Sequence, residues 1–114
     1  MVSERGRVVR VPMAEVLYLK AELKYVTLRT SARSYVLDDS LTDLEQRLGD
    51  QVLRVHRNAL VARHAVRALE RRRLADAEDE GDEVGWAVQV ATTGDWLAVS
   101  RRQVSAVREA LEAG

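Results

Sequence analysis

Residues 53–63 read Leu53-Arg54-Val55-His56-Arg57-Asn58-Ala59-Leu60-Val61-Ala62-Arg63. Residues 52–55 are apolar except for one arginine, which predicts a short strand. The next segment, residues 57–61, is compatible with a turn or with a short helix. The stretch therefore joins a strand to a basic and polar junction, and it is the most informative part of the chain.

On the N-terminal side of this stretch, short apolar segments predict a series of strands. Valine is the commonest residue of the chain, with 17 copies, and it is enriched in strands. Pro12 ends the first segment, and the polar residues 31–33 separate the third from the fourth. The predicted strands cover residues 8–11, 16–21, 25–30 and 34–37.

A short amphipathic helix is predicted over residues 40–49. Ser40 is a suitable N-cap, Asp43 stands at the capping-box position, and Gly49 is a suitable C-terminal stop. Three leucines are spaced by three and four residues, as on one face of a helix, namely Leu41, Leu44 and Leu48.

The C-terminal part predicts further strands and a second helix. Its strands cover residues 66–74, 85–91 and 96–99, the last two as a hairpin. Trp86 and Trp96 fall on the two hairpin strands and are expected to be core residues or a cross-strand pair. Ser100, with Gln103 three residues later, is predicted to cap a terminal helix with the apolar stripe Val104, Val107 and Leu111.

These elements predict a mainly β domain of about eight short strands and two short helices. Most connections are too short for the crossovers that parallel strands need, so the sheets are expected to be mostly antiparallel. A chain of 114 residues holds one domain. Residues 1–7 carry charges without an apolar segment, so we expect them to be residual linker or disordered, and residues 8–114 to be the domain.

The composition excludes several classes of protein. The chain has no cysteine, which excludes disulfide scaffolds, cysteine-ligated zinc and thiol catalysis. His56 and His64 have no third ligand at a metal spacing, so we expect neither a metal nor another cofactor. No apolar stretch approaches the about 18–20 residues of a membrane helix, and the N-terminus does not resemble a signal peptide. We therefore expect a cytoplasmic protein.

The net charge is zero, but the charges are segregated along the chain. Residues 54–73 contain seven arginines and one acid, and residues 76–83 contain six acids and no base. The basic block is compatible with a phosphate-binding face, and equally with a solvated pair of strands neutralised by the acids. The acidic run is typical of a mobile hairpin tip. Zero net charge therefore does not argue against a nucleic-acid partner.

Three segments together resemble the LytTR DNA-binding domain, the output module of many bacterial two-component response regulators, and in particular its AlgR type. The central segment is residues 53–63, which is the most specific of the three. The other two read Val16-Leu17-Tyr18-Leu19-Lys20-Ala21-Glu22-Leu23-Lys24-Tyr25-Val26 and Val99-Ser100-Arg101-Arg102. The segments have the family's order and spacing, and the resemblance extends from about Val8 to Leu111.

The resemblance implies an elongated arrangement of small, mostly antiparallel sheets with short helices. It also implies sequence-specific binding of double-stranded promoter DNA, through loops that carry side chains into successive major grooves. Members of the family typically bind paired half-sites as two protomers. A receiver domain would precede this domain in a full-length response regulator.

The resemblance further implies which side chains read bases. Lys24, Arg57 and Arg101 match positions that reach into the major groove. An arginine fork suits this role because it can donate two hydrogen bonds to guanine O6 and N7. His56 is expected to support the turn that carries Arg57, and a direct contact with DNA is the alternative for this histidine.

Contacts to phosphate are expected at four other positions. Asn58 and Ser100 match family positions that can contact phosphate, and Arg63 and Arg102 are further candidates. The acidic run 76–83 looks longer than is usual in the family. Because it would oppose DNA electrostatically, we expect it to point away from the DNA-binding face.

Three alternative functions follow from the residues alone. An enzyme would need a catalytic constellation, and His56 with Asp50 is the only pair to suggest, so we expect no enzymatic activity. Arg67 and Arg71 have the spacing used by cyclic-dinucleotide-binding β-barrels, but the companion motif is missing downstream. A protein-interaction module that docks through its basic block is the last alternative.

Overall fold

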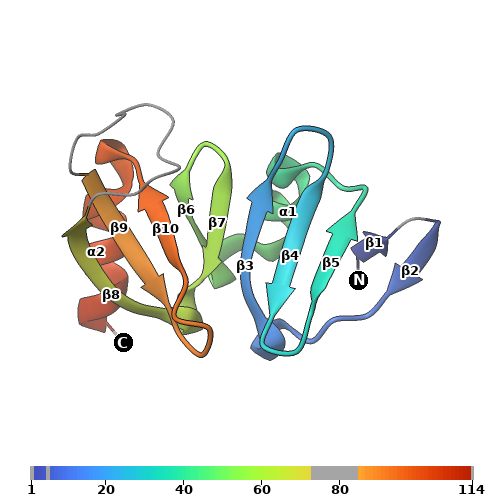
Figure 1. Ribbon diagram of the computed structural model, residues 1–114, viewed down its shortest axis with the longest axis horizontal. Coiled ribbons are helices and arrows are strands. Elements are labelled where there is room, and N and C mark those ends of the chain that lie inside the picture. Colours follow the sequence, from blue (N-terminus) through green and yellow to red (C-terminus); the bar gives the residue numbers. More distant parts are fainter. Residues whose placement is uncertain (1, 5, 73–84, 114) are drawn as a thin grey trace.

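The computed structural model describes residues 2–4, 6–72 and 85–113. The strands in this part of the chain form two main sheets and one short hairpin, and all of their pairs are antiparallel. The sheets lie side by side along a long axis of 40 Å, against 31 and 24 Å for the other axes (Figure 1). The predicted architecture of small antiparallel sheets with two short helices is confirmed.

The larger sheet has five strands in the order β5-β4-β3-β7-β6. Its central strand pairs with β4 on one side and with β7 on the other. A cluster of buried aliphatic side chains joins this sheet to the helix α1 (Leu41–Leu48). The five strands are β3 (Val16–Ala21), β4 (Val26–Thr30), β5 (Ser34–Leu37), β6 (Val52–His56) and β7 (Ala59–Ala62).

The sequence leaves open whether residues 57–61 form a turn or a short helix. In the structure, most of this segment belongs to the strand β7. Arg57 and Asn58 form a two-residue turn, and the chain then continues as a strand between β3 and β6. All four residues of β7 are buried. A strand that is covered on both faces is apolar at every position, so it lacks the alternation that identifies strands in a sequence.

α1 begins and ends where its leucine spacing and flanking residues predict. The Ser40 hydroxyl oxygen accepts a hydrogen bond from the Asp43 N–H at 3.1 Å, so the predicted N-cap is confirmed. Gly49 ends the helix with a positive φ of 56°, a conformation that glycine adopts without steric cost. Leu41 and Leu44 are buried beneath the sheet.

The smaller sheet has the order β10-β9-β8 and is covered on one face by α2 (Val104–Ala113) (Figure 1). Its strands are β8 (Val66–Arg72), β9 (Gly85–Val90) and β10 (Trp96–Val99). Val107 of α2 is fully buried in one cluster with Val88 and Val99 of the sheet. The helical stripe predicted from the sequence therefore faces the core.

The two tryptophans lie on opposite faces of the smaller sheet. Trp86 is opposite Val99, which is three positions along β10 from Trp96. Because side chains alternate between the faces of a strand, the expected alternative of a cross-strand tryptophan pair is wrong. Each half-buried ring lies under an arginine instead. The guanidinium carbon is 5.7 Å from the ring centroid for Arg108 on Trp86 and 4.1 Å for Arg72 on Trp96.

A short hairpin precedes the larger sheet. It consists of β1 (Val2–Glu4) and β2 (Arg7–Val9), joined by a turn in which Gly6 has a φ of 85°. Part of the segment 1–7, expected to be linker, is therefore paired as a strand. The charged composition of the segment does not reveal this pairing, which depends on the single glycine at the turn.

The two main sheets share one apolar cluster, and a polar contact joins them near the surface. Buried members of the cluster come from both sheets and include Leu17, Val55, Val61, Val90 and Leu97. The Tyr18 hydroxyl of β3 donates a hydrogen bond to Asp95 Oδ2, just before β10, at 3.1 Å. Burial, and then the neighbouring Asp95 carboxylate, raise the pKa of Tyr18 to about 12.

In the described part of the chain, no helix is both long and apolar enough to cross a membrane. Among the same residues there is no group of three or more metal-ligating side chains that could hold an ion. Of the two histidines, His64 places Nε2 3.2 Å from the Met13 carbonyl oxygen, in a hydrogen bond across the fold.

We expect Tyr18→Phe to flatten the pH dependence of stability under alkaline conditions. The phenol ionises near pH 10 in the unfolded chain and near pH 12 in the folded one, so its contribution is complete below pH 10 and is lost as the pH rises through 12. Urea denaturation at about pH 9 and about pH 11.5 should show a larger loss of unfolding free energy for the wild type than for Tyr18→Phe. Equal losses would contradict the partly buried contact with Asp95.

Candidate nucleic-acid interface

Three turns that are distant in sequence meet along one edge of the molecule, uppermost in Figure 1. The Ala21 N–H donates to the Asn58 carbonyl oxygen at 2.7 Å, which joins the first turn to the second. The Ser100 N–H donates to the Val55 carbonyl oxygen at 2.8 Å, which joins the third to β6. We call this edge the turn edge, and it consists of residues 22–25 between β3 and β4, 57–58 between β6 and β7, and 100–103 between β10 and α2.

Each residue expected to read bases stands on a different turn of the turn edge. Lys24, Arg57 and Arg101 are all exposed. An exposed cation on a tight turn can extend beyond the backbone toward an anionic or acceptor-rich partner. The structure thus places on one edge three residues that are more than 30 positions apart in the sequence.

Arg54 anchors the turn that carries Arg57. Its Nε donates to the His56 carbonyl oxygen at 3.1 Å, and its Nη2 donates to the Arg57 carbonyl oxygen at 2.8 Å. Its Nη1 pairs with Glu45 Oε1 of α1 at 2.6 Å. The guanidinium therefore fixes the β6–β7 turn to a helix, and charge-assisted hydrogen bonds of this kind are stronger than neutral ones.

The sequence does not identify Arg54 and Glu45 as part of the site. In the sequence, Arg54 is recognisable only as one arginine of the basic block 54–73. Strand alternation gives a partial signal, because the neighbours Leu53 and Val55 are buried and Arg54 must point to the other face. Nothing in the sequence indicates that this face receives a carboxylate from α1.

His56 and Asn58 interact with each other inside the β6–β7 turn. The Asn58 N–H donates to His56 Nδ1 at 3.3 Å, with the tautomer assigned from this contact. Both residues are half-buried. One ring nitrogen of His56 is thus engaged within the turn.

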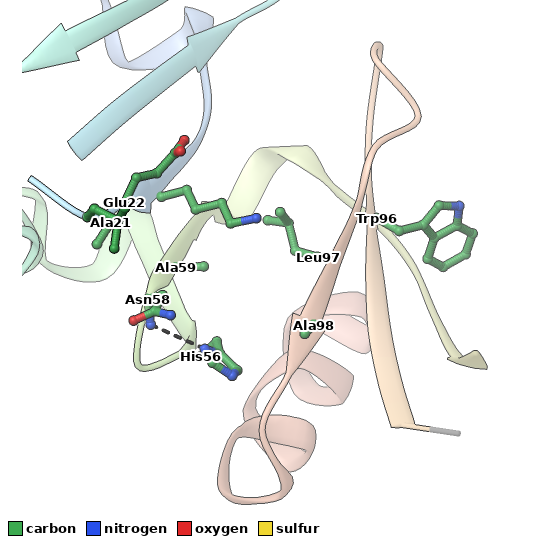
Figure 2. Close-up of a pocket in the computed structure, with 10 residues that line it drawn as sticks. Ala21, Glu22, His56, Asn58, Ala59, Trp96, Leu97 and Ala98 are labelled. Atoms are coloured by element: carbon green, nitrogen blue, oxygen red, sulfur yellow. Dashed lines mark hydrogen bonds between the residues drawn. The ribbon is translucent and has the colours of Figure 1, made fainter. Parts of the chain in front are cut away.

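A cleft of about 420 Å³ separates the two sheets at the turn edge (Figure 2). Its walls come from the end of β3, from the β6–β7 turn and from β10, with His56, Asn58 and Leu97 among the lining residues. The ring of Trp96 points away from the cleft in Figure 2. The cleft marks the boundary between the part of the edge that carries Lys24 and the part that precedes α2.

The junction before α2 is a 3-10 turn, η4 (Arg101–Gln103), rather than the first turn of the predicted helix. Ser100 precedes it, but its side chain makes no capping hydrogen bond, so the predicted side-chain cap is wrong. The backbone closes the turn instead, because the Gln103 N–H donates to the Ser100 carbonyl oxygen at 2.9 Å. Arg101 and Arg102 are exposed at the start of η4.

Arg63 does not lie on the turn edge. Arg63 follows the C-terminal end of β7, whereas Asn58 precedes the N-terminal end of that strand. At about 3.3 Å per residue, Arg63 and Asn58 are roughly 16 Å apart along the strand. Its Nε donates to the Asp50 carbonyl oxygen at 2.5 Å. Asp50 belongs to the turn η2 (Gly49–Gln51) before β6, and His56 ends that strand, so the pair weighed as a catalytic dyad is not formed.

The basic block 54–73 is divided among several surfaces. Arg54 is engaged inside the fold and Arg57 lies on the turn edge, while β8 carries Arg67, Arg71 and Arg72. The block is therefore not one continuous phosphate-binding face. Arg73 and the acidic run 76–83 lie outside the described residues, so the expectation that this run points away from DNA stays a prediction.

A family model for the LytTr DNA-binding domain matches residues 6–112. The chain belongs to the LytTR DNA-binding domain family. The match includes all three turns of the turn edge, so the resemblance noted in the sequence and the geometry of the fold concern the same residues.

Two relatives with known roles are similar to this LytTR domain. The positive alginate biosynthesis regulatory protein of Pseudomonas aeruginosa is 39% identical over 98 residues, which are 86% of this chain and 36% of that protein. The CO-responsive transcriptional regulator RcoM of Rhodospirillum rubrum is 34% identical over 99 residues, 86% of this chain and 38% of that protein. The chain thus spans somewhat more than a third of each relative.

A solved structure has the same fold. It is the LytTr DNA-binding domain of a putative methyl-accepting/DNA response regulator from Bacillus cereus, with a TM-score of 0.70 at 22% identity. The superposition covers 96% of this chain and 93% of that one. The arrangement of sheets and helices is therefore that of a LytTR domain.

We expect Arg54→Lys to destabilise the LytTR domain by about 1–2 kcal/mol, because lysine keeps the charge but its single nitrogen cannot reach all three acceptors that separate guanidinium nitrogens bond. Urea denaturation measures the loss, and amide exchange at Asn58 should accelerate. Arg47→Lys is the matched control, since Arg47 is exposed on α1 and its ion pair with Asp39 is a long one of 3.7 Å, so this replacement should change stability by under about 0.5 kcal/mol. Equal stability of the two variants would contradict the anchoring role.

Proposed function

We propose that this LytTR domain recognises specific sequences in double-stranded promoter DNA through its turn edge. Lys24, Arg57 and Arg101 contact base edges in the major groove. The observation that carries this proposal is the convergence of the three turns, because it presents three exposed cations along one edge of a rigid fold. The family assignment favours this function over a cyclic-dinucleotide or protein-docking module.

The dimensions of the domain agree with contacts in successive major grooves. On one face of B-DNA, successive major grooves are about 34 Å apart. The long axis of the domain is 40 Å, and the turn edge occupies the part of it between the β3–β4 turn and the start of α2 (Figure 1), so a domain that lies along the duplex extends from one groove toward the next. A guanidinium or ammonium group at such a turn can hydrogen-bond to guanine O6 and N7.

Contacts to the DNA backbone would hold the turn edge in place. Asn58, Ser100 and Arg102 lie on the second and third turns, next to the proposed base-reading residues, and we assign them to phosphate contacts. Arg63 is at the far end of β7, and we do not include it in the interface. His56 supports the turn between them through its contact with Asn58.

The whole protein would then be a transcription regulator of the response-regulator type. We propose that two protomers bind paired half-sites and that a receiver domain stands on the N-terminal side. The similarity to an alginate biosynthesis regulatory protein and to a CO-responsive transcriptional regulator supports the regulatory role. DNA binding at promoters would take place in the cytoplasm, and it requires neither a cofactor nor a catalytic step.

Selection of bound duplexes from a random pool tests the proposal and yields the half-site and its spacing. We expect one enriched motif with guanines at major-groove positions, and an affinity that falls steeply as salt rises. Arg57→Ala and Arg101→Ala should each relax the motif at their own position, by about 1–3 kcal/mol of discrimination.

Arg63→Ala is the matched control, because it removes the same charge away from the turn edge. Its selected motif should equal that of the wild type. No enrichment at low salt would contradict DNA recognition. An unchanged motif for both Arg57→Ala and Arg101→Ala would contradict the assignment of these residues, while leaving sequence-specific binding intact.

A further inference from the structure

The β3–β4 turn presents an aliphatic side chain at its tip. Leu23 is 102% exposed, the largest exposure among the large hydrophobic residues of the described chain. Tyr25, on the other side of Lys24, is 46% exposed. Two of the three exposed large hydrophobic residues in this part of the chain therefore flank one proposed base-reading cation, and the third, Val8, lies on the N-terminal hairpin.

The position of this leucine is fixed by the backbone. The Glu22 N–H donates to the Tyr25 carbonyl oxygen at 2.8 Å, which closes the turn with Leu23 and Lys24 at its tip. The adjacent Ala21 N–H is bonded to Asn58 in the neighbouring turn. The Thr27 hydroxyl also donates to Glu22 Oε1 at 3.3 Å. The turn is thus tied at its base, and Leu23 at its tip is exposed beside the cleft between the two sheets, which it helps to line.

A single exposed leucine on a protein surface needs no explanation. Here the leucine shares its turn with Lys24, and it lies on the edge that also carries Arg57 and Arg101. If this edge enters the major groove, Leu23 enters with it. The groove contains acceptors and donors on every base pair, but only one apolar group, the C5 methyl of thymine.

We propose that Leu23 packs against the C5 methyl group of a thymine next to the base that Lys24 contacts. The turn then reads two adjacent features of the DNA. The ammonium group selects acceptors such as guanine O6 and N7, and the isobutyl group selects a thymine over a cytosine. This inference rests on the proposed DNA-binding function and adds a specificity-determining residue to it.

The test replaces each thymine of the selected operator in turn by deoxyuridine, which removes the C5 methyl and leaves pairing unchanged. Affinities are measured by equilibrium titration of the domain with each duplex. For the wild type, we expect one deoxyuridine per half-site to weaken binding about fourfold, the effect of about 0.8 kcal/mol for one buried methyl group. Leu23→Ala should bind all duplexes with the same affinity.

Two variants serve as controls. Val8→Ala shortens another exposed aliphatic side chain away from the turn edge and should keep the full response to deoxyuridine. Lys24→Ala should lower affinity for the operator but keep the response, because Leu23 remains. Leu23→Ala removes a side chain that is fully exposed in the free domain, so its folding should be unaffected.

A wild-type domain that binds its operator specifically but tolerates every deoxyuridine would overturn the role of Leu23 and leave the proposed function standing. The role of Leu23 is equally contradicted if Leu23→Ala responds to deoxyuridine as the wild type does. If Leu23→Ala reduces only the cooperative binding of a second copy, the leucine contacts protein rather than DNA. Absence of any selected operator would overturn both proposals.

Discussion

Two backbone hydrogen bonds determine how the site of this LytTR domain is assembled. One joins Ala21 to Asn58 at 2.7 Å, and the other joins Ser100 to Val55 at 2.8 Å. Both connect a neighbouring segment to the β6–β7 hairpin, so this hairpin is the element to which the other two turns are attached. Arg54 in turn fixes the hairpin to α1 through Glu45. The placement of the three turns therefore depends on backbone hydrogen bonds and on the Arg54 side chain.

Hydrophobic burial makes this arrangement rigid. β6 and β7 contribute to the cluster shared with the smaller sheet and to the cluster beneath α1, so the hairpin is packed on both sides. Val55, Leu60 and Val61 are fully buried. A close-packed core has low compressibility. The turns at the ends of its strands are therefore held in a fixed geometry before DNA is bound. Preorganisation of this kind lowers the entropic cost of association.

The sequence predicts the elements of this fold better than it predicts their contacts. The leucine spacing and Ser40 define α1, and short valine-rich apolar segments define most strands, because each signal is local. β7 is ambiguous because burial on both faces removes its alternation, and the cap proposed for Ser100 fails because a 3-10 turn precedes α2. Arg54 and Arg63 look alike in the basic block, yet only the fold shows that one anchors the central turn and the other lies at the far end of β7.

We propose that the three turns face the same DNA molecule together. Because the chain has no cysteine, single-cysteine variants Lys24→Cys, Arg57→Cys, Arg101→Cys and Arg63→Cys can each carry a short photo-activated crosslinker. On the selected operator, the first three should crosslink to bases on one face of the duplex in an order that follows the turn edge, and Arg63→Cys should not. Crosslinking from Arg63→Cys at a comparable yield, or from only one of the three turns, would contradict the account.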